Sequence, residues 1–217
     1  MTDRPLISAD AMVRALLAGT KRQTRRLATS PLARAQPGDR LWVREAWMSD
    51  APRDGTWPHL GFFDSGQAPL SLIPPVYRSK RYCLFRATWR GDLIGWKPPI
   101  FMPRWASRVT LIVTDVRRQR LGDITPAEAE AEGLTGIIRD RQTVWGIPDQ
   151  DGTPGTGEGG WAMARWQADP RLAYYQLWRG LHPRGEDDPE VVALTFRVQE
   201  QNIDDMVAPA APRSKAA

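Results

Sequence analysis

Residues 8–47 read SADAMVRALLAGTKRQTRRLATSPLARAQPGDRLWVREAW. Apolar residues at helical spacing between Ser8 and Gly19 predict a short helix, with Ser8 as its N-cap and Gly19 just past its end. A polar, cationic segment follows directly. A Pro-Gly-Asp turn then leads into a strand predicted over residues 40–47, where apolar and polar residues alternate.

Glu45 is out of place in this predicted strand, because it shares a face with three apolar residues. A carboxylate on an apolar face needs a charged partner. Lys21 and Arg104 are candidate partners in a binding site, and a buried structural ion pair is the alternative.

The rest of the chain alternates strands and helices around two irregular segments. Strands are predicted over residues 82–89, 108–116 and 191–198, and helices over residues 125–133 and 169–180. Separate strands with few helices between them favour an α+β fold, here a small mixed or antiparallel barrel with short helices packed at its ends. We expect a single domain over residues 1–207.

Two stretches have no sustained hydrophobic period, residues 49–80 and residues 134–168, and we interpret them as long inserted loops. Within the second, the glycine-rich run at residues 152–160 predicts a mobile hairpin or lid. The Ala/Pro/Ser/Lys composition of residues 208–217 predicts a disordered tail.

Composition excludes several classes of site. The 217 residues include one cysteine, Cys83, and two histidines, His59 and His182, both beside proline and expected to be exposed. One cysteine cannot form an internal disulfide or a cysteine-based zinc site. We expect no metal or cofactor. No apolar run is long enough to cross a membrane and no signal core begins the chain, so we expect a cytoplasmic protein without a membrane partner.

Charge is distributed unevenly along the chain. The total is +5, but residues 1–120 hold 21 cations and 9 anions, whereas residues 121–217 hold 9 cations and 16 anions. Such asymmetry is typical of a protein that meets phosphate or another anion with one surface. Ten tryptophans are also unusual, and Trp105, next to Arg104 in an irregular segment, is the one we expect to stack on a base.

Several motifs together resemble a known family. Residues 19–26, GTKRQTRR, resemble the Gly-x-Lys-x-x-Thr-x-Arg signature of the ASCH domain family, within the PUA-like superfamily. Residues 37–45 (PGDRLWVRE) and 102–108 (MPRWASR) resemble a phage and prophage branch of that family, and residues 124–134 (ITPAEAEAEGL) are similar to its short acidic helix. The resemblance covers about residues 5–47, 82–134 and 170–200, and leaves the two insertions outside.

The resemblance implies a PUA-like barrel and a role with nucleosides or RNA. Small bacterial members of the family are amidohydrolases that cleave N4-acylated cytidine with a lysine, a threonine and a glutamate. These fall on Lys21, Thr24 and Glu132 of this chain. Other members are associated with RNA binding or cleavage.

The residues can also be weighed on their own. Cationic neighbours Arg22, Arg25 and Arg26 favour a lowered pKa for Lys21, as a general base needs, although a solvated cationic loop that holds phosphate is the simpler alternative. Glu132 is expected in the last turn of its helix, against the helix dipole. Glu128 and Glu130 are expected to be solvated.

Two functions follow. In the first, a metal-independent amidohydrolase uses Lys21 as general base, Thr24 as nucleophile or water-positioning group and Glu132 to orient Lys21 or the substrate amine, with Arg26 and Arg104 holding an oxyanion or a phosphate. In the second, a binding module reads a modified or exposed base in nucleic acid, RNA more than DNA, and the basic half, including Arg25, contacts the backbone. The sequence does not indicate which protein partners, if any, the chain has.

Overall fold

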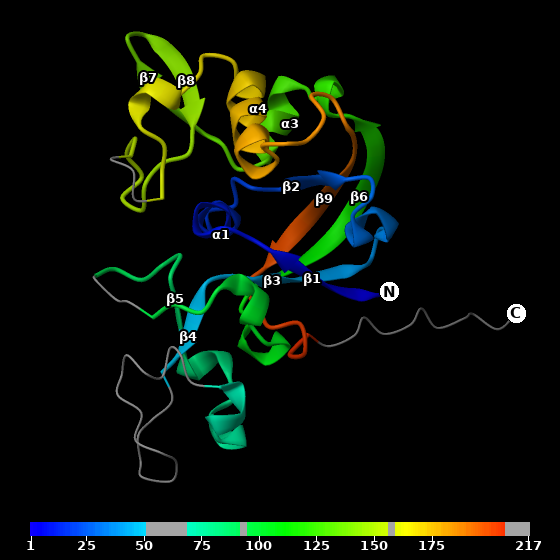
Figure 1. Cartoon of the computed structure of the whole chain (residues 1–217), viewed down its shortest axis with the longest axis vertical. Coiled ribbons are helices and arrows are strands. Elements are labelled where there is room, and N and C mark those ends of the chain that lie inside the picture. The colour runs from blue at the N-terminus through cyan, green and yellow to red at the C-terminus, as the bar shows by residue number, and fades with distance from the viewer. Residues whose placement is uncertain (51–68, 92–94, 156–158, 207–217) are drawn as a thin grey trace, which may run out of the picture.

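The computed structural model describes residues 1–50, 69–91, 95–155 and 159–206, and it is an α+β structure built on one five-stranded sheet (Figure 1). The sheet has the order β1-β3-β6-β9-β2. Its strands are β1 (Asp3–Ile7), β2 (Gln23–Leu27), β3 (Arg40–Arg44), β6 (Thr110–Arg120) and β9 (Glu190–Gln199). Two-stranded sheets are formed by β4 (Trp47–Ser49) with β5 (Cys83–Phe85) and by β7 (Thr135–Arg139) with β8 (Gln142–Gly146), and the helices are α1 (Asp10–Leu17), α3 (Pro126–Ala131) and α4 (Pro170–Leu181).

The predicted α+β class is confirmed, but strand pairing does not close a barrel. β1 pairs only with β3, in parallel, and β2 pairs only with β9, antiparallel, so both are edge strands of the described sheet. Pro5 suits β1 to an edge, because proline cannot donate a ladder hydrogen bond. A side chain links the two edges instead: Arg26 of β2 donates to the carbonyl oxygen of Ile7 in β1 at 3.3 Å.

The cationic segment after α1 forms a strand that the sequence did not predict. β2 pairs with β9 in a register that places Thr24 opposite Leu194 and Arg26 opposite Val192. Gln23, Thr24 and Arg25 are buried in it. β2 lacks the alternation of apolar and polar residues that predicts a strand, because its buried side chains are polar and contact other polar groups.

The N-cap residue predicted from the sequence is found in two of the three helices described, α3 and α4. Thr125 caps α3 and forms a capping box with Glu128, and Asp169 caps α4, as predicted. α4 continues to Leu181, past Gly180. The prediction for Ser8 is wrong: Ala9 is the N-cap of α1 and provides no side-chain cap.

The two segments interpreted as insertions contain ordered structure. β7 and β8 form a hairpin that the sequence does not predict, and it precedes the glycine-rich run at residues 152–160. Residues 156–158 of that run, residues 51–68 of the first insertion, with His59, and the predicted tail lie outside the described residues. The strand predicted over residues 40–47 is interrupted: it leaves the main sheet after Arg44, and Trp47–Ser49 pair with β5.

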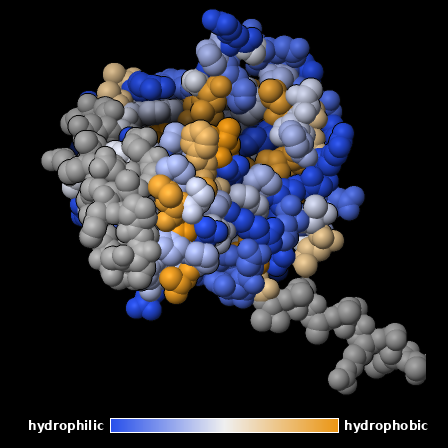
Figure 2. Space-filling view, turned by 60° about the horizontal axis from the view of Figure 1, so that its bottom comes forward, coloured by the Kyte–Doolittle hydropathy of each residue, from blue (hydrophilic) through white to orange (hydrophobic). Residues whose placement is uncertain are grey.

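Two apolar clusters flank the polar strand β2. One packs α1 against the main sheet, with Val13, Leu16 and Leu41 at its centre. The other joins α3, α4 and the β7–β8 hairpin through Leu121 and Trp178. On the face drawn in Figure 2, hydrophobic residues form a broken band between hydrophilic regions. No helix among the described residues has the length and apolar character needed to cross a membrane.

Candidate functional site

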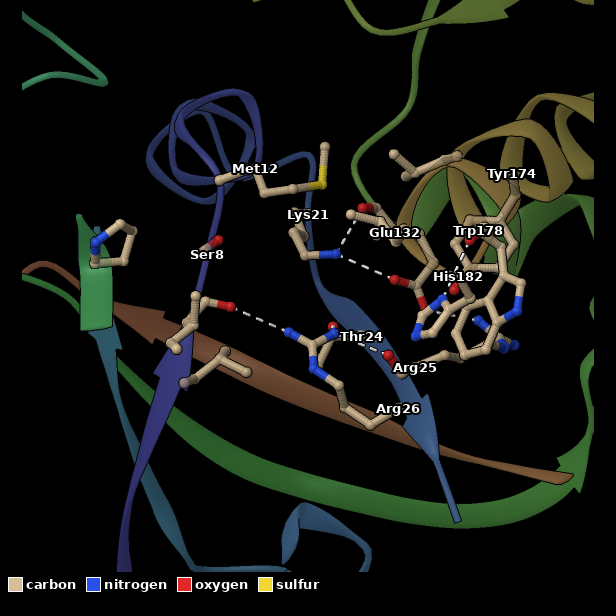
Figure 3. Close-up of a pocket in the computed structure, with 16 residues that line it drawn as sticks. Ser8, Met12, Lys21, Thr24, Arg25, Arg26, Glu132, Tyr174, Trp178 and His182 are labelled. Carbon is tan, nitrogen blue, oxygen red and sulfur yellow. Dashed lines mark hydrogen bonds and ion pairs between the residues drawn. The ribbon is translucent and has the colours of Figure 1, made fainter. Parts of the chain in front are cut away.

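A pocket of about 530 Å³ opens where β2 faces the end of β1, the start of α1 and the last turns of α4 (Figure 3). Lys21, Thr24 and Glu132, the three predicted catalytic residues, all line it, together with Arg25 and Arg26. The other walls are mostly apolar and include Leu6, Ile7, Met12, Leu177, Trp178 and Leu181. Residues far apart in the sequence therefore meet in one cavity of the size that small molecules occupy, about 300–1,000 Å³.

Lys21 and Glu132 meet through both backbone and side chain. An isolated antiparallel bridge joins the two residues. The Lys21 ammonium donates to the Glu132 carbonyl oxygen at 2.7 Å and to its Oε2 at 3.1 Å. Gly133 permits this approach, because its φ is +99° and a Cβ there would lie 3.1 Å from the Lys21 Cβ. The ion pair is only 5% exposed at Lys21 and 3% at Glu132.

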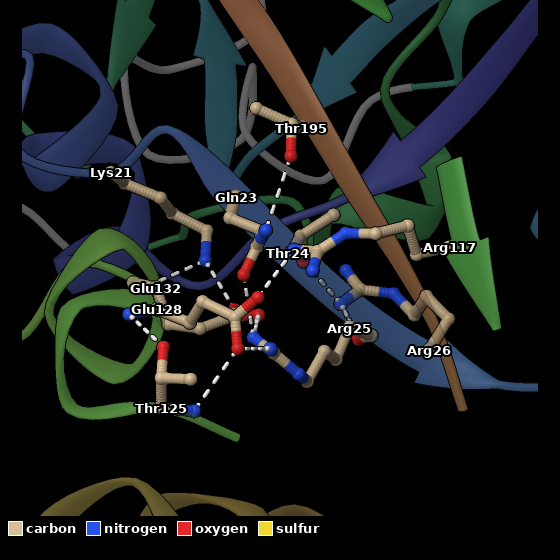
Figure 4. A network of polar contacts seen from close by, with 10 residues as sticks. All are labelled: Lys21, Gln23, Thr24, Arg25, Arg26, Arg117, Thr125, Glu128, Glu132 and Thr195. Atoms are coloured by element: carbon tan, nitrogen blue, oxygen red, sulfur yellow. Dashed lines mark hydrogen bonds and ion pairs between the residues drawn. The ribbon is translucent and has the colours of Figure 1, made fainter. Parts of the chain in front are cut away.

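Arg25 fixes the other side of the Glu132 carboxylate (Figure 4). Its Nη1 donates to Glu132 Oε1 at 2.9 Å and to Gln23 Oε1 at 2.7 Å, and its Nη2 donates to Glu128 at 3.0 Å. Glu128 also pairs with Arg117 and accepts the Thr125 N–H. Glu128 is thus part of the buried network, which corrects the prediction that it is solvated.

Burial lowers the pKa of Lys21 below the usual lysine value of 10.5. Glu132 opposes that shift through its charge, while Arg26 and Arg25 add to it. The predicted direction agrees, although burial rather than cationic crowding is the largest cause. A lysine whose charged form is disfavoured, yet which is held in a fixed position, has the property required of a general base.

Thr24 is joined to Arg26 rather than to Lys21. The Thr24 hydroxyl accepts a hydrogen bond from Arg26 Nη1 at 2.7 Å, and the same nitrogen donates to the Arg25 carbonyl oxygen. The hydroxyl proton is therefore left free to point elsewhere. Lys21 and Thr24 line the same pocket without a direct hydrogen bond, so a reacting water or substrate atom would have to connect them.

α4 contributes an aromatic wall that the sequence did not assign to the site. Tyr174, Trp178 and His182 line the pocket, and His182 stacks on Trp178 with ring centroids 4.1 Å apart. His182 Nδ1 lies 3.1 Å from the Trp178 carbonyl oxygen. The ring is partly buried, so the prediction that His182 is exposed is wrong. The spacing of Tyr174, Trp178 and His182, one per helical turn, is the signal that indicates a shared face.

Three predicted binding residues lie away from this pocket. Glu45 is fully buried and pairs with Arg108 at 2.9 Å through both carboxylate oxygens, not with Lys21 or Arg104. Burial raises the Glu45 pKa, and Arg108 opposes the shift. Glu45 therefore belongs to a buried structural ion pair and not to a binding site.

Arg104 and Trp105 also have structural contacts. Arg104 bonds Asp3 at 2.6 Å and Asp204 at 2.8 Å. Trp105 packs edge-to-face on Trp47, with ring centroids 5.7 Å apart. Neither lines the pocket. We therefore exclude both from the candidate site.

Carboxylates neutralise much of the basic first half of the chain. The arginines of that half that form ion pairs include Arg25, Arg40, Arg86, Arg104, Arg108 and Arg117. Several of their partners come from distant segments, such as Glu128 and Glu132 of the acidic second half. Many cations of the basic first half are thus paired with carboxylates within the fold, so the charge asymmetry along the sequence does not form one basic surface.

Within the described residues, no cluster of three or more His, Cys, Asp or Glu side chains could hold a metal ion. Comparisons of the chain with protein-family models, with curated proteins and with solved structures found no match. The pocket and its contacts are therefore the observations from which a function can be argued.

Proposed function

We propose that this chain is a metal-independent amidohydrolase that removes the acyl group from N4-acylated cytidine. The observation that carries the proposal is the convergence of Lys21, Thr24 and Glu132 on one pocket, with the buried Lys21 ammonium held by Glu132. A PUA-like, ASCH-type fold is part of the same proposal, supported by the motif at residues 19–26 and by the small α+β architecture.

In the proposed reaction, neutral Lys21 takes a proton from a water molecule as the water oxygen attacks the acyl carbonyl carbon. The tetrahedral intermediate then collapses: the bond between the carbonyl carbon and the cytidine N4 breaks, and N4 receives a proton from the Lys21 ammonium. The products are cytidine and a carboxylic acid. Lys21 is suited to both steps because burial lowers its pKa while Glu132 stabilises its protonated form.

Thr24 has two roles open to it. Its hydroxyl, oriented by Arg26, can position the water or can itself attack and carry the acyl group as an ester before hydrolysis. Glu132 acts through Lys21, since its carboxylate is shared between Lys21 and Arg25. The aromatic wall of α4 offers Tyr174, Trp178 and His182 as surfaces for the base.

The experiment incubates the protein with N4-acetylcytidine and follows cytidine formation by absorbance and chromatography. Wild type should turn over, and Lys21→Met should lose roughly 10²–10⁴-fold in rate, the usual contribution of a general base. The two roles of Thr24 differ in whether an acyl-enzyme forms. An acyl-enzyme that can be trapped in wild type, but not in Thr24→Val, which lacks the hydroxyl, supports the nucleophile. Arg22→Gln is the matched control, because Arg22 is an exposed neighbour outside the pocket.

Absence of turnover by wild type, or undiminished turnover by Lys21→Met, would reject the catalytic proposal. Tight binding of a modified cytidine or of RNA without product formation would favour the alternative, a non-catalytic module that reads an exposed base. That alternative also predicts affinity that falls steeply with salt.

A further inference from the structure

Arg26 is a pocket cation without a carboxylate partner among the described residues. Its three hydrogen bonds go to the Thr24 hydroxyl and to the backbone carbonyl oxygens of Arg25 and Ile7. A guanidinium has five N–H bonds, so two remain for a ligand. Arg25 differs, because two carboxylates neutralise it. Burial lowers the Arg26 pKa, a sign that its charge is costly where it stands.

Further unused donors line the pocket that contains Arg26, next in the chain after Ile7, whose carbonyl oxygen accepts from Arg26. Ser8 is 6% exposed and lines the pocket, and its hydroxyl has no hydrogen-bond partner among the described residues (Figure 3). Ser8 leads into α1, whose N-cap residue Ala9 supplies no side-chain cap. Among the described residues, the first N–H groups of α1 have no hydrogen-bond partner, and this end of a helix is the one where anions are favoured. Ala9 and Met12, at this end, line the pocket as well.

The nearby carboxylates leave room for an anion. Asp10, in the first turn of α1, pairs with Arg86 at 3.2 Å and does not line the pocket. Glu132 does line it, but Lys21 and Arg25 hold its two oxygens. The pocket is thus lined by three cationic side chains and one carboxylate, which pairs with Lys21 and Arg25. The Glu132 charge partly offsets the effect of burial on the Arg26 pKa, but Arg26 forms no ion pair among the described residues.

We propose that Arg26, Ser8 and the N-terminus of α1 bind a phosphate ester, so that the ligand of this pocket is a mononucleotide rather than a nucleoside. That the ligand contains a nucleoside rests on the proposed function. That it carries a phosphate rests only on Arg26, Ser8 and the N-terminus of α1. The phosphate is a permanent anion, bound before and after the reaction, whereas a transition-state oxyanion would need the same donors only transiently. Both the catalytic group Lys21 and the phosphate corner lie in one cavity of about 530 Å³.

The test is calorimetric titration of wild type, Arg26→Gln, Ser8→Ala and Arg22→Gln with four probes at fixed ionic strength. The probes are cytidine, cytidine 5′-monophosphate, cytidine 3′-monophosphate and orthophosphate. In wild type, one of the two nucleotides should bind at least about ten-fold more tightly than cytidine, as a charge-assisted hydrogen bond predicts. Arg26→Gln should abolish that advantage, Ser8→Ala should reduce it, and Arg22→Gln should leave it unchanged.

The outcomes separate this inference from the proposed function. If cytidine and both nucleotides bind wild type equally, or if Arg26→Gln and Ser8→Ala keep the nucleotide advantage, the phosphate site is rejected while a nucleoside site stands. If only orthophosphate binds, and Arg26→Gln abolishes it, the phosphate site stands and the nucleoside proposal fails. If no probe binds wild type, both fail. Acylated substrates give a further check. If Arg26 binds a phosphate, Arg26→Gln should raise KM for the acylated nucleotide. If Arg26 instead stabilises an oxyanion, Arg26→Gln should lower kcat for both the acylated nucleotide and the acylated nucleoside.

Discussion

Replacement of Glu132 by glutamine tests the buried charge network most sharply. The carboxylate accepts from Lys21 Nζ at 3.1 Å and from Arg25 Nη1 at 2.9 Å. Lys21 is 5% exposed and Arg25 1% exposed, so neither cation can turn to water when the negative charge is removed. Glutamine keeps the shape and one acceptor oxygen. The substitution therefore removes charge with little change in packing.

The expected cost follows from the contacts that remain. Removal of one partner from a buried ion pair destabilises a protein by about 3–5 kcal/mol. Here Lys21 keeps its bond to the carbonyl oxygen of residue 132 at 2.7 Å, and Arg25 keeps Glu128 at 3.0 Å. We therefore expect the lower end, about 3 kcal/mol at pH 7.

The cost should also depend on pH. Burial lowers the Lys21 pKa, and Glu132 opposes that shift, so the variant's Lys21 loses its proton at lower pH than that of wild type. Between the folded pKa and the unfolded value near 10.5, the unfolded state binds one more proton than the folded state, and stability rises with pH. The difference between Glu132→Gln and wild type should therefore shrink as pH rises from 7 toward 10.

Urea unfolding followed by circular dichroism, at pH 7 and at pH 9.5, measures both effects. Glu130→Gln is the matched control, because Glu130 belongs to the same helix and has no ion pair in the described structure; it should change stability by less than about 0.5 kcal/mol. A Glu132→Gln variant as stable as wild type at pH 7, or a difference that grows with pH, would show that Glu132 is not the buried counter-charge of Lys21.

Three further predictions concern the surroundings of the site. Gly133→Ala should destabilise the protein by about 1–3 kcal/mol in thermal or urea unfolding, and by more than Gly19→Ala, because both have positive φ but only at Gly133 would the Cβ meet side chains at 3.0–3.1 Å. Arg108→Met should lower the free energy of unfolding by about 3–5 kcal/mol at pH 7, because it leaves the Glu45 carboxylate buried without a partner. The loss should be smaller at pH 5, because burial raises the Glu45 pKa and the carboxyl can then take up a proton. An equal loss of stability at both pH values would contradict this. Burial raises the pKa of Cys83 to about 12, so a thiol reagent at pH 8 should modify it only after unfolding, and rapid modification of the native protein would show the thiol to be accessible.

The elements that the sequence predicted best are those with local signals. The capping box of Thr125 and Glu128 and the Asp169 cap each lie within a few residues of the helix they begin, so short-range pattern is enough. The candidate catalytic residues also follow from sequence motifs, residues 19–26 for Lys21 and Thr24 and residues 124–134 for Glu132. Only the structure shows that the three line one pocket.

The predictions that failed depended on distant partners. The sequence does not predict β2 because its buried residues are polar: Arg25 is charged, and Glu132, one of the two carboxylates that neutralise it, lies more than a hundred residues further along the chain. His182 was expected to be exposed because it stands beside a proline, whereas stacking on Trp178 brings it to the pocket. Arg104 was assigned to the site for its charge, but Asp3 and Asp204 neutralise it.

The pH dependence of N4-acetylcytidine hydrolysis tests the central claim, that Lys21 is the base of a hydrolytic pocket. We expect wild-type kcat/KM to rise with pH to a plateau reached below the usual lysine pKa of 10.5, and Lys21→Met to lower the rate and remove the rise. Wild-type protein that forms no cytidine at any pH, or a rising limb that persists in Lys21→Met, would contradict it.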